Sequence, residues 1–366
     1  MNKKKEIMNR KSRRIVHIIP DQKFTLGYMN YMTKEVSQEI EHFFVIITKK
    51  KENKFELPDL KKTKYICINK PEQLFQKSVF TILKDSDKII VSGVFNGVWV
   101  ELVKMPRKIM KKIYLHFWGG DFYGYRDVKI LSKDFIYKML LWRCIRRCAG
   151  IITLVPRDYD ELSKIFPNSK PHFTAAMPED PDRVDNYGKY FSKRVKSNKI
   201  LLGNSATREN CHFEVMELLE HLKDENLEII CPLAYGDRSY AMSVEEEGMR
   251  IFGSKFKAIL DYQDFDSYKN MIAGCSVGIF ANNRQQAMGN IAMMIMMGRK
   301  VYLREGTSMW YSYLDYGIKM YPISELNKIT YSELMDYNES IAMENDKKIR
   351  KRYNDYVRNW SAIFNI

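Results

Sequence analysis

The stretch KILLGNSATRENCHFEVMELL, residues 199–219, carries the pattern on which the fold prediction rests. A short apolar run, Lys199–Leu202, is followed by a glycine-led polar turn and then by apolar residues at helical spacing over Cys211–Lys223. A strand, a tight turn and a helix in this order begin a βαβ unit, from which open parallel sheets are built.

The same alternation recurs along the whole chain. Further strands are expected at Ile15–Ile19, Phe43–Thr48, Tyr65–Asn69, Lys88–Val91, Ile113–Phe117, Gly150–Val155, Leu227–Pro232, Lys257–Leu260, Ser276–Phe280 and Lys300–Arg304. Further helices are expected at Leu26–Glu41, Pro71–Leu83, Val98–Met105, Asp134–Cys148, Arg157–Phe166, Tyr240–Phe252, Asp266–Gly274, Met288–Met297 and Ser332–Ile366. A turn-rich polar stretch over residues 178–198 separates the two series and predicts a linker.

These elements predict an α/β protein with two Rossmann-like domains that face a central cleft. The expected parts are a basic tail over residues 1–14, a first domain over 15–180, a linker over 181–198, a second domain over 199–340, and a C-terminal helix over 341–366 that could cross back to the first domain. In doubly wound folds the ligands bind at the carboxyl ends of the strands. Functional residues are therefore expected directly after strands.

The composition is that of a folded protein, with 45% hydrophobic and 13% aromatic residues. No apolar run approaches the roughly 20 residues that a membrane-spanning helix needs. The apolar stretch behind the basic N-terminus, Ile15–Pro20, is too short for a signal-peptide core, and the six cysteines lack metal-type spacing. We therefore expect a cytoplasmic protein.

The positive charge is concentrated in the first half of the chain. Residues 1–180 hold 35 Lys and Arg against 20 Asp and Glu, whereas residues 201–366 hold 19 against 23. Such a one-sided field suits an anionic partner, either a nucleic acid or a lipid surface. The segment Lys133–Arg147 combines cations with aromatic and apolar residues, which favours an anionic bilayer. An ordinary helix packed on its sheet remains the alternative.

Two loops of the second domain have the composition of phosphate-binding turns. The first, Gly203–Phe213, places Asn204, Ser205 and Thr207 before a helix, whose N-terminal N–H groups attract anions. The second, Ala281–Asn290, leads into another helix and holds one cation and three amides: Arg284, Gln285, Gln286 and Asn290. Plain helix caps or polar surface turns are the structural alternatives.

The first domain offers an acidic and aromatic loop, WGGDFYGY over Trp118–Tyr125. A carboxylate held against apolar rings can have a raised pKa, which suits a general base, so Asp121 is a candidate catalytic residue, with a helix cap as its alternative role. Asp21, at the end of the first strand, is a second candidate. His17 and His116 lie within strand patterns and are minor candidates beside a structural role.

Several of these segments occur together in one known family. Besides His17 and Asp21 they are GVFNGVWV (93–100), HFWGGDFY (116–123), GNSATREN (203–210), CPLAYGDRSY (231–240), FANNRQQAMG (280–289) and LREGTSMW (303–310). From about Arg14 onward the sequence resembles the TDP-N-acetylfucosamine:lipid-linked disaccharide N-acetylfucosaminyltransferases of bacterial surface-polysaccharide assembly, glycosyltransferase family 56.

The resemblance implies a GT-B fold, an acceptor-binding first domain, a nucleotide-sugar-binding second domain, and peripheral association with the inner face of the plasma membrane. Together with the candidates above it gives a donor site of Gly203, Asn204, Ser205, Thr207, Tyr235, Arg284, Gln285, Gln286, Gly289, Asn290 and Glu305. The acceptor or sugar side would hold His17, His116, Trp118, Gly119, Gly120 and Tyr123. The resemblance also implies a metal-independent reaction, and we expect no cofactor.

The predicted function is transfer of a deoxy-amino-sugar similar to N-acetylfucosamine from a TDP-sugar to a polyprenyl-diphosphate-linked oligosaccharide. A transferase of the same fold that uses a UDP- or GDP-sugar and a non-catalytic scaffold are alternatives. A nucleic-acid-binding protein is the alternative from another class, which needs a basic groove with stacking platforms. The cations of Lys133–Arg147 lie instead among apolar residues, so we expect no nucleic-acid partner.

Overall fold

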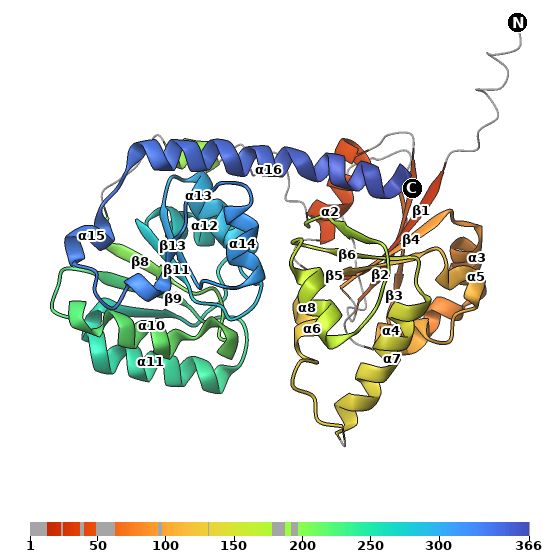
Figure 1. Ribbon diagram of the computed structural model, residues 1–366, viewed down its shortest axis with the longest axis horizontal. Helices are drawn as coiled ribbons and strands as arrows, with labels where there is room; N and C mark the ends of the chain where they lie inside the picture. The colour runs from red at the N-terminus through yellow and green to blue at the C-terminus, as the bar shows by residue number, and fades with distance from the viewer. Residues whose placement is uncertain are drawn as a thin grey trace, which may run out of the picture. The chain divides into compact units, whose positions relative to one another are not determined.

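The computed structural model describes residues 13–22, 25–36, 40–48, 63–93, 97–130, 132–177, 187–191 and 197–365. The chain divides into two compact units, one drawn from Met1–Asp180 and Asp355–Ile366 and the other from Pro181–Asn354 (Figure 1). Most of the predicted basic tail, residues 1–14, and of the predicted linker, residues 181–198, lies outside the described residues. The two units are described separately below.

The first unit is built on a parallel sheet. Its described strands are β1 (Arg14–Pro20), β2 (Glu41–Ile47), β3 (Thr63–Ile68), β4 (Lys88–Ser92), β5 (Ile113–Phe117), β6 (Gly150–Thr153) and β7 (His172–Thr174). They lie in the order β3-β2-β1-β4-β5-β6-β7, and each neighbouring pair is parallel. Strands β4 and β5 are buried along their whole length, which is typical of a parallel sheet covered on both faces.

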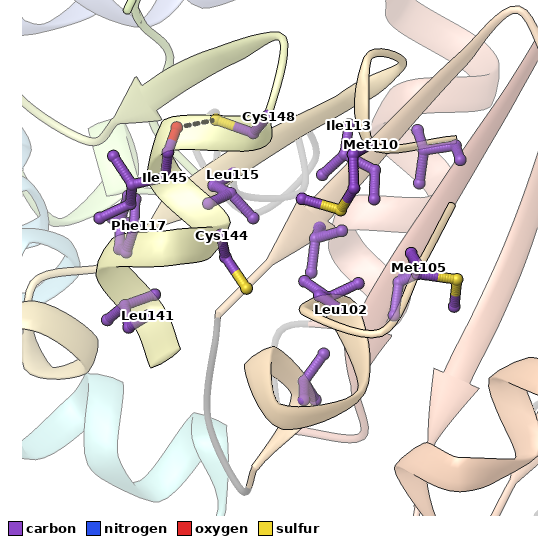
Figure 2. Close-up of a cluster of buried hydrophobic side chains, with 14 of the residues drawn as sticks. Leu102, Met105, Met110, Ile113, Leu115, Phe117, Leu141, Cys144, Ile145 and Cys148 are labelled. Atoms are coloured by element: carbon purple, nitrogen blue, oxygen red, sulfur yellow. Dashed lines mark hydrogen bonds between the residues drawn. The ribbon is translucent and has the colours of Figure 1, made fainter. Parts of the chain in front are cut away.

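Helices alternate with these strands. They are α2 (Thr25–Tyr31), η1 (Met32–Val36), η2 (Pro71–Phe75), α3 (Lys77–Asp85), α4 (Val98–Leu102), α5 (Arg107–Met110), α6 (Gly120–Tyr123), α7 (Lys133–Arg147) and α8 (Asp158–Ile165). Figure 2 shows the core that they share with the sheet, in which Leu141, Cys144 and Ile145 of α7 cluster with Leu115 and Phe117 of β5. Burial raises the pKa of Cys144 to about 12, so its thiol is a protonated core group.

The second unit repeats this plan. Its described strands are β8 (Lys199–Leu202), β9 (Glu228–Pro232), β10 (Phe256–Ile259), β11 (Val277–Phe280), β12 (Lys300–Leu303) and β13 (Tyr321–Pro322), in the parallel order β10-β9-β8-β11-β12-β13. Its helical elements are η3 (Arg208–Asn210), α10 (His212–Leu219), η4 (Glu220–Leu222), α11 (Arg238–Phe252), η5 (Gly253–Lys255), α12 (Phe265–Ala273), α13 (Met288–Met296), α14 (Ser308–Leu314), η6 (Ile323–Glu325) and α15 (Tyr331–Met335). The last helix, α16 (Glu339–Asn365), begins in this unit, and its residues from Asp355 onward belong to the first unit.

The strand orders locate a switch point in each sheet. In the first unit β1 lies between β2 and β4, so the chain leaves β1 toward β2 and leaves β4 toward β5, in opposite directions. In the second unit the chain likewise leaves β8 toward β9 and β11 toward β12. Loops at the carboxyl ends of strands diverge at such a point and leave room for a ligand. The loops after β1 and β4, and after β8 and β11, are therefore the places to look for a site.

The predicted succession of strands and helices agrees with the structure apart from a few elements. The helix predicted over Leu26–Glu41 is wrong at its end, because α2 and the π-helical turn η1 stop at Val36 and Glu41 already begins β2. The strands β7 and β13 were not predicted. They are 3 and 2 residues long, too short for an alternating pattern to stand out.

The end of α16 completes the core of the first unit. Trp360 is fully buried, and its ring packs edge-on against Tyr28 and His116, with ring centroids 5.8 and 5.3 Å apart. Its indole N–H donates to the carbonyl of Ala176 at 3.2 Å. A residue close to the C-terminus therefore fills space among residues of the first unit.

Candidate functional site

The loop after β8 is shaped by a glycine and an asparagine. Gly203 has a φ of 67°, and a Cβ there would come within 2.8 Å of the side chains of Asn210 and His212, so no larger residue fits. Asn210 is fully buried; its side-chain oxygen accepts the N–H of Asn204 at 3.0 Å, and its Nδ2 donates to the Thr207 hydroxyl at 2.9 Å. Asn210 thus holds the predicted donor residues of this loop in place.

The loop after β11 is joined to the loop after β8 by side chains. Gln286 Nε2 donates to the hydroxyls of Ser205, at 3.1 Å, and Thr207, at 3.3 Å. The guanidinium of Arg284 contacts Glu209 Oε1 at 3.4 Å. The structure therefore brings together predicted donor residues from both loops.

The two helices that follow these loops begin without side-chain caps. Cys211 and Ala287, at the N-caps of α10 and α13, have φ values of 51° and 58°, which few residues other than glycine adopt, and neither helix has a side-chain cap hydrogen bond. In the same unit α11, α12, α14 and α15 are capped by Asp237, Asp264, Thr307 and Thr330. The first N–H groups of α10 and α13 are thus suited to an external anion.

Several buried polar atoms around these loops have no hydrogen-bond partner among the described residues. Asn282 is fully buried with both amide atoms unpaired, and Gln285, almost fully buried, has an unpaired Oε1. The others nearby in the chain are Asn204 Oδ1, Gln286 Oε1 and His212 Nε2. Buried polar groups are normally paired with protein or water. Such a concentration is what a binding site with displaceable water or ligand partners would leave.

Tyr235 and Glu305 lie in loops at the same edge of the sheet. The carbonyl of Tyr235 accepts the N–H of Ala206 at 2.6 Å, so the loop after β9 is bound to the loop after β8, while the Tyr235 ring is exposed. Glu305 follows β12, and its carboxylate accepts a hydrogen bond from the hydroxyl of Ser324. Tyr235 thus lies beside the loop after β8, whereas the contact of Glu305 is with Ser324, which follows β13.

The first turn of α13 holds the remaining predicted donor residues. Gly289 is exposed. The Nδ2 of Asn290 donates to the Tyr268 hydroxyl at 2.7 Å, which directs this amide nitrogen toward α12. The side chain of Asn290 is thus hydrogen-bonded within the second unit, whereas Gly289 is exposed to solvent.

Three residues at this edge were missed in the sequence, namely Glu209, Asn210 and Arg304. Arg304 directly follows β12; its Nε donates to the carbonyl of Ala281 at 2.9 Å, and its guanidinium pairs with Glu214 of α10. Their positions in GNSATREN and LREGTSMW could have pointed to them, because these segments were already singled out.

In the first unit the two candidate acids follow β1 and β5. The Asp21 carboxylate accepts the Thr48 hydroxyl at 2.9 Å, and Asp21 is half-buried. Asp121 is almost fully buried, and its two carboxylate oxygens accept the N–H of Trp118 at 3.0 and 3.1 Å. That contact stabilises the turn after β5. The helix cap considered for Asp121 is wrong, because Asp121 lies inside α6, whose N-cap is Gly119.

The aromatic loop around Asp121 packs against its neighbours. Gly93, after β4, has a φ of 62°, and a Cβ there would come within 2.9 Å of the Trp118 ring. Gly119 has a φ of 97°, and Gly120 is exposed at the start of α6. Tyr123 is buried and its hydroxyl donates to Asp158 at 2.8 Å. Trp118 therefore reaches the loop after β4, whereas the hydroxyl of Tyr123 is bound to the buried Asp158.

His17 and His116 are fully buried in the first sheet. The ring nitrogens of His17 contact Tyr28 and His42, each at 2.9 Å, and those of His116 contact Ser92 at 3.0 Å and the carbonyl of Ala175 at 3.1 Å. Desolvation lowers the pKa of both imidazoles, that of His116 to about 3, so both are neutral at pH 7. These contacts favour the structural role for both.

The part of the chain that the structure describes holds neither a cluster of metal ligands nor a helix suited to span a membrane. No three or more His, Cys, Asp or Glu side chains in that part of the chain gather as metal ligands would. No helix within it combines the length and the apolar character that a membrane span requires.

The family described as 4-alpha-L-fucosyltransferase, glycosyl transferase group 56, matches residues 16–366. The chain belongs to this family. The resemblance predicted from the sequence is thereby confirmed, and the protein is a glycosyltransferase, as predicted.

Solved structures confirm the GT-B fold of this glycosyltransferase. A glycosyltransferase from Rickettsia africae is 12% identical with a TM-score of 0.62, over 97% of this chain and 98% of that chain. HepE of Anabaena, solved in complex with UDP, is 9% identical with a TM-score of 0.61, over 96% and 100%. The N-terminal domain of trehalose-6-phosphate phosphatase from Candida albicans is 10% identical with a TM-score of 0.65, over 97% and 96%.

Proposed function

We propose that this glycosyltransferase moves a deoxy-amino-sugar similar to N-acetylfucosamine from a TDP-sugar to a polyprenyl-diphosphate-linked oligosaccharide in bacterial surface-polysaccharide synthesis. The observation that carries the proposal is the pair of uncapped helix N-termini, of α10 and α13, beside Arg284 at the switch point of the second sheet. Helix N-termini and a guanidinium are the groups that bind a diphosphate. HepE, which has the same fold, is described in complex with UDP.

The same groups would stabilise the departing nucleoside diphosphate. Charge develops on the leaving phosphate as the glycosidic bond breaks, and fixed donors aimed at it lower the barrier without a metal ion. A carboxylate of the first unit would take the proton from the acceptor hydroxyl. Asp21 suits this role better than Asp121, because Asp21 is half-buried while both oxygens of Asp121 accept the Trp118 N–H.

A thermal-shift panel of nucleotides tests the donor. Thymidine diphosphate at about 100 times its Kd is expected to stabilise the second unit by about 2.7 kcal/mol, which raises its Tm by about 5 °C or more. UDP and GDP at the same concentration should give smaller shifts. A larger shift with UDP or GDP would identify a UDP- or GDP-sugar as the donor in place of the TDP-sugar. If no nucleotide changed the Tm, the proposed site would be contradicted.

We further propose that α7 attaches the protein to the inner face of the plasma membrane. Figure 1 shows the start of α7 and the loop before it projecting beyond the other elements of the first unit. Among the described residues of this region, the exposed large apolar side chains are those of Ile130, Ile136, Tyr137 and Met139. The helix carries five Lys and Arg against one acid. Exposed apolar side chains beside cations suit an anionic bilayer, which binds both.

The variant Ile136→Glu tests this attachment. It removes an apolar side chain that is 63% exposed and adds a charge that anionic lipids repel, so binding to phosphatidylglycerol-containing vesicles should fall about tenfold. Met343→Glu is the matched control, because Met343 on α16 is 58% exposed. Vesicle co-sedimentation measures both. Equal binding of Ile136→Glu and the parent protein would rule out α7 as the attachment surface.

A further inference from the structure

We infer that Glu209 limits the affinity of the donor site, because its carboxylate competes with the phosphate groups of the donor for Arg284. The inference rests on the proposed nucleotide-diphosphate site. Arg284 Nε and Nη2 each contact Glu209 Oε1 at 3.4 Å, and Nη1 donates to the carbonyl of Gln285 at 3.1 Å. All three guanidinium nitrogens therefore already have acceptors within the two loops.

The burial of this pair explains why Arg284 needs a counter-charge. The side chain of Arg284 is 16% exposed and that of Glu209 is 39% exposed. A cation so far removed from water is stabilised by an anion at its side, and a diphosphate could serve as well as a carboxylate. Because both anions use the same N–H groups, phosphate binding requires Arg284 to exchange one for the other.

The backbone of Glu209 is fixed, which keeps its carboxylate close to Arg284, where it can compete with a phosphate group. Its backbone carbonyl accepts the N–H of Asn283 at 3.0 Å, which binds the loop after β8 to the loop after β11. Its neighbour Asn210 is fully buried and organises the same loop. A glutamine at position 209 would keep the backbone contact and the shape of the side chain, and would remove only the charge.

A second ion pair shows that the chain after β8 supplies negative charge to another arginine at this edge of the sheet. Arg304 pairs with Glu214 of α10, as Arg284 pairs with Glu209. Both arginines, in the loops after β11 and β12, are therefore paired with a glutamate from the chain that follows β8. Phosphate groups would bind here by exchange with a carboxylate, which lowers their net affinity and favours release of the nucleoside diphosphate after transfer.

Isothermal titration with thymidine diphosphate, and separately with inorganic pyrophosphate, tests the competition. Glu209→Gln should bind both about threefold more tightly, the effect of an ion pair of partial exposure. Glu247→Gln is the control for net charge, because Glu247 pairs with Arg250 on the surface of α11. It should bind like the parent. In an Arg284→Ala background, Glu209→Gln should have no effect.

The outcomes separate this inference from the proposed site. If Arg284→Ala binds both probes as tightly as the parent does, the diphosphate site itself is wrong, and the role of Glu209 is lost with it. If Arg284→Ala weakens binding while Glu209→Gln leaves it unchanged, the site stands and the competition is refuted. Equal tightening by Glu209→Gln with and without Arg284 would also refute it, because the effect would then be one of general charge.

Discussion

Replacing Arg284 by alanine is expected to lower kcat/KM for sugar transfer about 100-fold, the usual cost of removing one preorganised donor to a developing charge. Arg284 lies in the loop after β11, directly before the uncapped N-terminus of α13, and it is the one cation of that loop. This loop contacts the loop that leads to the uncapped N-terminus of α10. Loss of the guanidinium would leave the departing diphosphate to uncharged donors, namely backbone N–H groups and the polar side chains of the two loops. Release of nucleoside diphosphate in the presence of an acceptor measures the rate.

Arg250→Ala provides the matched control for this experiment. Arg250 also pairs with a glutamate, Glu247, but it lies on the exposed surface of α11 and should be replaceable without loss of transfer. Arg284→Ala activity within about threefold of the parent would exclude a role in transition-state stabilisation. Unchanged melting temperatures would show that either result concerns chemistry and not folding.

Replacing Trp360 by alanine should destabilise the first unit by about 3 kcal/mol or more, because large-to-small changes of buried aromatic residues leave a cavity. Trp360 is fully buried against Tyr28, His116 and Phe364, and its N–H is bonded to a carbonyl. Thermal unfolding followed by circular dichroism should show a Tm lower by about 6 °C or more.

The control for this variant lies on the same helix. Met343→Ala removes an apolar side chain that is exposed, so the Tm should stay within about 1 °C of that of the parent. If Trp360→Ala melted like Met343→Ala, the end of α16 would contribute nothing to the core of the first unit, and the packing described above would be wrong.

Much of the fold could be predicted from the sequence, because parallel strands and amphipathic helices leave separate periods in the chain. The strand Lys199–Leu202 was predicted with the bounds that the structure has. The helix predicted over Leu26–Glu41 failed because its polar end has no period that separates a π-helical turn from the start of a strand. Boundaries depend on tertiary contacts that local patterns do not record.

The candidate site was predicted less completely. Arg284 and Gln286 could be found because a cation and amides before a helix have an evident use. Their contacts with Glu209 and Ser205 join loops more than 70 residues apart, and no local pattern reports such a distance. The burial of Asp121 and its contact with Trp118 likewise depend on how the chain folds back at the end of β5.

The place of Trp360 and Phe364 has a consequence for biosynthesis. Phe364 packs against His17 and His42, with ring centroids 6.0 and 5.6 Å apart, so residues close to the C-terminus cover strands near the N-terminus. A ribosome makes the seven described strands of the first sheet long before it reaches these two aromatic residues. Part of the aromatic core of the first unit therefore stays uncovered until the end of the chain has been synthesised. The described residues of the second unit all precede position 355, so that unit can fold earlier. The part of the chain that begins first is completed last.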